Sequence, residues 1–172
     1  MSRVCLRYLT ITLLLFSLCC SACAHQLKAV RGGSYSDPQG YFELVLPEDG
    51  WQLLSWKDVD FVLWDQKSGA TMVVNVTPLK QGADLIALTN HLLIAFDAKR
   101  IISREQARID GREALKTVLE AREEGQEIAA EVYVVRGAGV SCDIMFWAPR
   151  DCFPRQVEAF HQLLLGIHFL KP

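Results

Sequence analysis

Histidines are the first residues to consider for chemistry, because imidazole both binds metals and transfers protons near neutral pH. Beyond residue 40 the chain has His91, His161 and His168. None of them stands beside another histidine, a cysteine or an aspartate at the spacing of a metal site. Gly166 and a predicted helix end separate His161 from His168. We therefore interpret all three as ordinary structural or exposed histidines and predict no metal site.

The chain also lacks the local motifs of common nucleophiles and phosphate-binding loops. Nothing in the sequence around Cys142 or Cys152 predicts a reactive thiolate. Ser103 and Ser141 lack the glycine-flanked turn of hydrolases, and the glycines at 137–139 lack the lysine of a phosphate loop. The sequence thus predicts no catalytic residue and no cofactor, and we expect the protein not to be an enzyme.

The N-terminal segment has the pattern of a bacterial export signal. Arg3 and Arg7 form a cationic start, and Leu9–Leu18 follows as an uncharged, almost wholly apolar stretch. Ten helical residues rise about 15 Å, only half the roughly 30 Å hydrocarbon core of a bilayer. Small residues come next, so residues 1–22 are predicted to be a cleaved signal peptide rather than a transmembrane helix.

The end of this segment resembles a lipobox, the motif that precedes the acylated cysteine of bacterial lipoproteins. In the run Cys19-Cys20-Ser21-Ala22-Cys23, the small residues Ser21 and Ala22 fit the motif, whereas Cys20 departs from the usual leucine. Cys23 is therefore the predicted lipid attachment site, and acyl chains such as palmitate would hold it in a membrane. Ordinary cleavage after Ala24, which would release a soluble periplasmic protein, is the alternative.

Export changes how the cysteines are interpreted. Three of the six leave with the signal and Cys23 would be acylated, so Cys142 and Cys152 remain in an oxidising compartment. Cys142 lies about 20 Å from the end of its predicted strand, and Cys152 comes just after that end. A disulfide needs Cα atoms within about 7 Å of each other. We expect no disulfide, with a Cys142–Cys152 bridge as the alternative.

Composition places the mature chain among ordinary folded proteins. The full sequence is 51% hydrophobic and 22% charged. Only Arg3 and Arg7 of its 18 basic residues fall in the signal, which holds none of the 20 acidic ones, so the mature part is mildly acidic. Such a surface gives no reason to expect nucleic acid or anionic lipid headgroups as partners.

The mature part divides into a tether and one domain. Residues 23–40 are polar and contain glycine, which predicts a tether, and 41–170 are predicted to form a single α+β domain. Apolar residues in and around 82–100 recur at three and four positions and predict a helix that ends at Lys99 and Arg100. Residues 112–136 read equally well as a helix or as two strands. Alternating or β-branched runs predict strands at 42–46, 51–55, 61–64, 71–77, 140–147 and 167–170, and Pro154 opens a second helix that runs to Leu165.

This order of elements resembles the PsbP-like and DcrB-like proteins. The likeness rests on the strand and acidic-glycine turn before Trp51, on "IDGREA" at 109–114 and on "MFWAP" at 145–149. The resemblance implies an α/β/α sandwich in which an antiparallel sheet of six to seven strands is flanked by two helices. It also implies that 112–136 is a β-hairpin. Members of the family include bacterial lipoproteins of unknown role and an extrinsic photosystem subunit.

The function expected from these patterns is that of an accessory or interaction module, anchored by lipid in the bacterial cell envelope and facing the periplasm. A lipoprotein that binds a small hydrophobic ligand between sheet and helices is the alternative. An exposed apolar patch would favour a protein partner, and a closed cavity of about 300 Å³ or more would favour a ligand.

Overall fold

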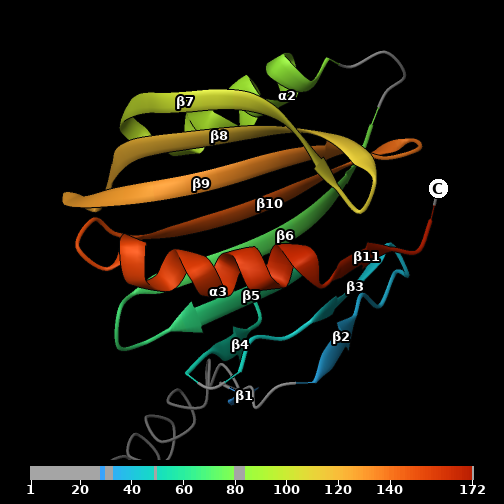
Figure 1. The fold of residues 1–172 in the computed structure, drawn as a ribbon, viewed down its shortest axis with the longest axis horizontal. Coiled ribbons are helices and arrows are strands. Elements are labelled where there is room, and N and C mark those ends of the chain that lie inside the picture. Colours follow the sequence, from blue (N-terminus) through green and yellow to red (C-terminus); the bar gives the residue numbers. More distant parts are fainter. Residues whose placement is uncertain (1–27, 30–32, 49, 80–83, 172) are drawn as a thin grey trace, which may run out of the picture.

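The computed structural model describes residues 28–29, 33–48, 50–79 and 84–171 (Figure 1). The signal peptide and Cys23 lie outside these residues. The helices are α2 (Leu85–Leu92), the short 3₁₀ helix η2 (Leu93–Ala95) and α3 (Phe153–Leu165). The strands are β1 (Lys28–Ala29), β2 (Ser34–Ser36), β3 (Phe42–Val45), β4 (Gln52–Leu54), β5 (Phe61–Asp65), β6 (Ala70–Pro78), β7 (Asp97–Ile109), β8 (Arg112–Glu123), β9 (Gln126–Arg136), β10 (Val140–Pro149) and β11 (Ile167–Phe169).

The strands form one large and one small sheet. Within the described residues, the large sheet has eight antiparallel strands in the order β1-β4-β5-β6-β10-β9-β8-β7. The small sheet has three, in the order β11-β3-β2. The strand β1 therefore lies at one edge of the large sheet and β7 at the other (Figure 1).

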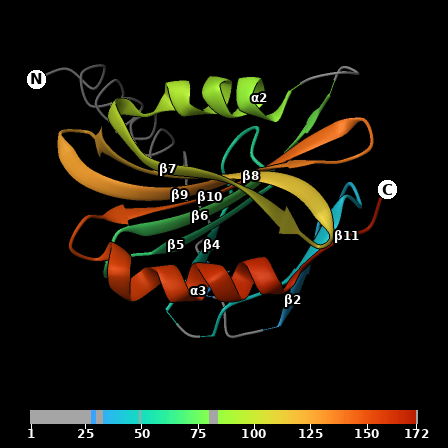
Figure 2. The ribbon, with the colours of Figure 1, turned by 45° about the horizontal axis from the view of Figure 1, so that its top comes forward.

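The two helices cover opposite faces of the large sheet (Figure 2). Helix α3 packs on β6, β9 and β10, and α2 packs on β8 and β9. Because side chains alternate along a strand, the residues of one strand point in turn to the α2 side and to the α3 side of the sheet. On the α3 side the core contains the buried Phe42, Phe61, Met72, Ile144, Phe146, Phe160 and Leu163. On the α2 side a smaller core contains Leu93, Leu119, Ala130 and Val132.

The small sheet packs at the C-terminal end of α3. The backbone of Gly166, just after α3, comes so close to β3 that a Cβ on this residue would lie 2.9 Å from the Cβ of Val45. The carbonyl of Gly166 accepts a hydrogen bond from the Val45 N–H at 3.1 Å. A glycine here lets α3 end directly against β3 and feed β11 into the same sheet.

The predicted fold class is confirmed: the chain has an α+β fold with an antiparallel sheet and a helix on each face. The large sheet is wider than the six to seven strands expected, because it also includes the two-residue β1 and the edge strand β7. The hairpin that the resemblance implied for 112–136 is present as β8 and β9. Alternation predicted which residues of β8 share a face, and Leu115, Leu119 and Ala121 are all buried.

The helix predicted at 82–100 is wrong in its second half. The backbone becomes extended at Phe96, and Lys99 and Arg100 lie in β7 instead of at a helix end. The apolar spacing that predicted the helix stops at this residue, and the charged sequence beyond it pairs with β8 along its length. Pairing with a long neighbouring strand outweighs the helix propensity of a short segment.

The predicted tether at 23–40 is also shorter than expected, because part of it belongs to the fold. The strand β1 pairs with β4, and β2 pairs with β3. The ring of Tyr35 in β2 lies 4.8 Å from that of Phe61, and its hydroxyl donates to the Asp60 carbonyl at 2.9 Å. Sequence patterns missed these strands because they are short and made largely of polar residues.

Candidate functional site

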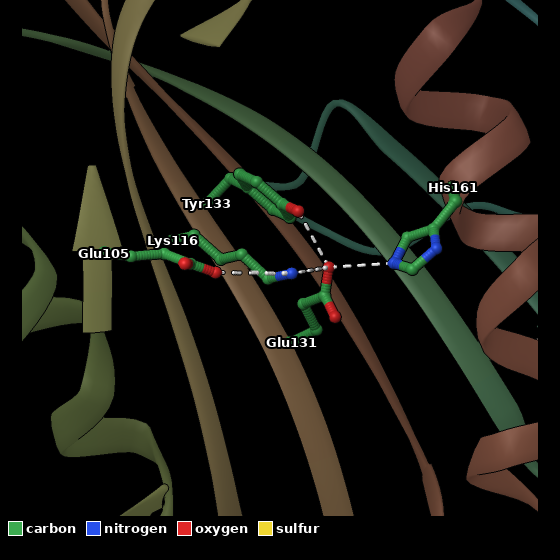
Figure 3. Close-up of polar contacts among 5 residues, drawn as sticks. All are labelled: Glu105, Lys116, Glu131, Tyr133 and His161. Carbon is green, nitrogen blue, oxygen red and sulfur yellow. Dashed lines mark hydrogen bonds and ion pairs between the residues drawn. The ribbon is translucent and has the colours of Figure 1, made fainter. Parts of the chain in front are cut away.

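A row of polar side chains crosses the sheet on the α3 side, from the edge strand β7 through β8 to β9. Cross-strand pairing places Glu105 of β7 beside Lys116 of β8, and Lys116 beside Tyr133 of β9. Glu131 lies two residues before Tyr133 on the same face of β9. Helix α3 contributes His161 from the other side (Figure 3).

These five residues form a cluster centred on Glu131, which we call the Glu131 cluster. Glu131 is only 4% exposed, and its Oε1 atom accepts a hydrogen bond from the Tyr133 hydroxyl at 2.8 Å. The same oxygen lies 3.0 Å from His161 Nε2 and 3.3 Å from Lys116 Nζ (Figure 3). The ammonium of Lys116 is also 3.7 Å from Glu105, a more exposed carboxylate. A single buried oxygen is thus surrounded by three hydrogen-bonding groups.

The electrostatics of the cluster follow from this burial. Burial first, and then the hydrogen bond to Glu131, raises the pKa of Tyr133 above its usual range, so this phenol stays protonated and donates. With His161 neutral, the two glutamates and Lys116 carry a net charge of minus one, and a proton on His161 would balance it. Removing such charges from water costs several kcal/mol, which hydrogen bonds to the carboxylate offset.

An open groove lies beside the cluster, with a volume of about 410 Å³. Lys116, Tyr133 and His161 line it together with the apolar side chains of Leu164, Leu165 and Ile167. Leu165 is 76% exposed, whereas Leu164 and Ile167 are buried. Arg108 and His168 also line the groove. The groove therefore combines an apolar wall with a floor of hydrogen-bonding groups.

The three histidines noted in the sequence have separate surroundings. His161 belongs to the Glu131 cluster, and His168 Nδ1 lies 3.5 Å from the carboxylate of Asp110. His91 lies on α2, against the opposite face of the sheet. Within the described ranges, no three histidine, cysteine, aspartate or glutamate residues are grouped so that they could hold a metal ion.

The two cysteines of the folded part are free thiols. Cys142 is buried in the larger core, and burial raises its pKa well above the usual value. A thiol in this state is a poor nucleophile. Cys152 is half-buried at the start of α3.

Sequence reasoning missed the centre of the site, although one signal pointed to it. Glu131 interrupts the apolar run from Ile128 to Val135. All the apolar side chains of this run except that of Ala129 are buried. A lone carboxylate in such a strand needs partners inside the protein. Tyr133 is a partner on the same strand, and the others come from β8 and α3. The hairpin implied by the resemblance put β8 beside β9, but the sequence did not show that α3 lies next to this position.

The arrangement can present hydrogen-bonding groups to a molecule in the groove. Such groups fix the orientation of a bound partner, while the apolar wall supplies contact area. The geometry is thus suited to binding.

A scan against protein-family models found no match, and a search of curated proteins found none. Solved structures do resemble this chain. CyanoP, the cyanobacterial PsbP of Synechocystis sp. PCC 6803, aligns with a TM-score of 0.59 at 15% identity, over 87% of this chain and 98% of its own. LpqN, described as involved in cell envelope biogenesis of Mycobacterium tuberculosis, aligns at 0.59 and 16%, over 86% and 92%.

A third structure, the protein of unknown function PA94 from Pseudomonas aeruginosa, has a TM-score of 0.55 at 12% identity and covers 79% of this chain and 95% of its own. At these identities the likeness concerns the fold and does not transfer an activity. The strand order and the helix on each face agree with these alignments. The chain therefore has a PsbP-like fold.

Proposed function

We propose that this protein is an exported, lipid-anchored, non-enzymatic accessory module of the bacterial cell envelope, which binds a partner protein at the groove beside the Glu131 cluster. The proposed location in the cell envelope rests on the signal-like residues 1–22 and on the lipobox-like run that ends at Cys23. The envelope role of LpqN, a protein of the same fold, supports it. In the described part of the chain, no helix is long and apolar enough to cross a membrane.

The observation that carries the proposal is the groove itself. An apolar side chain as exposed as Leu165, next to the buried walls formed by Leu164 and Ile167, is the pattern of an anchoring contact at an interface. The polar floor formed by Lys116, Tyr133 and His161 would give such a contact its specificity.

A partner protein fits better than a small ligand enclosed between sheet and helix. The space beneath α3 is filled by close-packed side chains, with the rings of Phe146 and Phe160 stacked at 5.2 Å. The 410 Å³ groove is open to solvent, as is a 510 Å³ groove beside the start of α2. Open grooves of this kind suit a side chain or loop of another protein.

Crosslinking in intact cells tests the proposal. A photoreactive residue at Leu165 should yield a discrete adduct with one partner protein. The same residue at Ile94 is the matched control, because Ile94 is 69% exposed but lies on the α2 side. Identical adducts from both positions, or none from Leu165, would contradict binding at the groove. A native protein that retains Met1 and stays in the cytoplasm would contradict the proposed location in the cell envelope.

A further inference from the structure

We infer that the segment Trp56–Lys57 contacts the surface of the bilayer, so that the protein sits with its β1–β4 edge against the membrane. This inference rests on the proposed acylation of Cys23. It depends on the direction in which the chain enters the fold, on the number of residues before it, and on the exposure of Trp56.

The direction of entry is set by the pairing of β1 with β4. Lys28 pairs with Leu53, and Ala29 pairs with Gln52. The N-terminal end of β1 therefore points toward the C-terminal end of β4. Trp56 follows β4 by two residues. A lipid-bearing cysteine upstream of Lys28 is thus attached at the edge of the sheet from which the Trp56–Lys57 segment emerges.

The distance from the lipid to this edge is short. Four residues, 24–27, separate Cys23 from Lys28. Even a fully extended chain of this length spans only about 18 Å between the two Cα atoms, at 3.3 to 3.6 Å per residue. The predicted tether of 23–40 would have allowed the domain to lie far from the membrane, whereas the pairing of β1 holds it close.

The exposed groups at this edge suit a membrane surface. Trp56 is 40% exposed, and its ring lies 6.4 Å from that of Trp147 on the α2 side of the sheet. Tryptophan favours the boundary between headgroups and hydrocarbon, and a lysine beside it can keep its ammonium in the aqueous headgroup layer. Lys57 is exposed beside Asp58, which is exposed as well, so residues 56–58 carry no formal net charge. Contact should therefore depend on Trp56 rather than on anionic lipid.

The same geometry places the proposed partner site away from the membrane. Seven strand spacings of about 4.8 Å separate β1 from β7, or roughly 34 Å across the sheet. The groove is lined from β7, β8, β9, α3 and β11, and not from β4 or β5. A partner would therefore approach from the aqueous side.

Fluorescence quenching by brominated lipids tests the contact. The mature chain from Cys23, with Cys152→Ser, is coupled through Cys23 to a maleimide lipid in phosphatidylcholine vesicles that carry bromine near the headgroups. Cys142 is buried and should not react. We expect bromine to quench tryptophan emission, and Trp56→Phe to remove at least half of the quenched fraction. Trp64→Phe, the control at a half-buried tryptophan, should keep it.

Two further variants separate membrane contact from mere exposure. A twelve-residue Gly-Ser insertion before Lys28 leaves Trp56 unchanged but frees the domain, and should cut the quenching by at least half. A tryptophan introduced by Ile101→Trp on β7, in the Trp56→Phe background, should not be quenched. Equal quenching of the parent and the insertion variant, or strong quenching from position 101, would overturn the inference.

Native acylation is measured separately, by the mass of the N-terminal peptide from cells and its change in Cys23→Ser. An acylated peptide without Trp56 quenching would overturn the membrane contact and leave the proposed anchor intact. Quenching of the coupled protein without native acylation would overturn the anchor, while the orientation imposed by β1 would hold.

Discussion

At the scale of single residues, Glu131 is the most unusual side chain in the fold. A carboxylate in the interior of a sheet is costly, and well-packed apolar residues often replace such groups without loss of stability. Here one oxygen of Glu131 serves Tyr133, His161 and Lys116 together. Its contacts hold Tyr133, His161 and Lys116 together where they line the groove, which is why we place Glu131 at the centre of the site.

The neutral variant Glu131→Gln should lower the free energy of unfolding by about 1 to 3 kcal/mol, because the half-buried Lys116 and His161 lose the charged acceptor that the buried Glu131 provides. Urea denaturation at pH 7 measures the change. The matched control is Glu127→Gln on the same strand, whose carboxylate is 61% exposed and pairs with Arg150. It should change stability by less than about 0.5 kcal/mol. Equal stabilities of the two variants would show that the Glu131 cluster contributes nothing.

Asp143 on β10 should make stability depend on pH. Burial raises its pKa from 3.8 to about 6, partly opposed by His91. Between these values the folded protein binds more protons than the unfolded chain, so this contribution to stability is present below pH 4 and lost as pH rises through 6. Asp143→Asn should therefore be the more stable protein at pH 8, by up to about 3 kcal/mol, and match the parent at pH 4.

Denaturation curves at pH 4, 6 and 8 measure this difference. Asp151→Asn is the control, because Asp151 is exposed in the turn after β10. Its stability should follow that of the parent at every pH. A stability gain in Asp143→Asn that is the same at pH 4 and pH 8 would argue against titration of Asp143 as its cause.

At the scale of elements, the sequence predicted most strands and α3, but not the residues that meet at the site. Alternation in 112–123 separated the apolar Leu115 and Leu119 from the charged Lys116 and Glu120. Periodicity could not show that the segment after Phe96 becomes an edge strand, because that outcome depends on pairing with β8. The Glu131 cluster was missed for the same reason, since its members come from four elements that only the folded topology brings together.

The β7–β8 turn shows how one residue joins elements. Asp110 has a positive φ of 47°, and its carboxylate accepts the Phe169 N–H of β11 at 2.8 Å. We expect Asp110→Ala to destabilise the protein by about 2 kcal/mol, because alanine disfavours this backbone conformation and cannot accept the bond. Asp110→Asn should cost less, since asparagine tolerates a positive φ. Thermal unfolding at pH 7 measures both.

The pH dependence separates the two roles of Asp110. The Phe169 N–H, and then His168, lower the pKa of its carboxyl below 3.8. Its charged form therefore adds stability above the pKa of the unfolded chain, and this is lost as pH falls through the folded value. The difference between the parent and Asp110→Asn should shrink below about pH 3.8. A constant difference down to pH 2 would mean that charge plays no part.

At the scale of the whole molecule, the boundary of the domain decides how the proposed lipid at Cys23 would hold the protein. The residues before Tyr41 contain two strands that join different sheets. The chain enters the domain through β1, at the edge of the large sheet opposite β7. The proposed partner site lies away from that edge. The short strand β1 therefore sets both the length of the proposed tether after Cys23 and the side from which the groove can be reached.

This boundary predicts the effect of truncation. A protein that begins at Tyr41 loses the contacts of Tyr35 with Phe42 and Phe61, and should be less stable than one that begins at Lys28 by about 3 kcal/mol or more. A protein that begins at Gly33 is the control: it keeps β2 and loses only the two-residue β1, so it should retain most of the stability. Urea midpoints of the three proteins measure these differences. Equal midpoints would mean that β2 is dispensable and that the folded domain begins at residue 41, as its sequence first indicated.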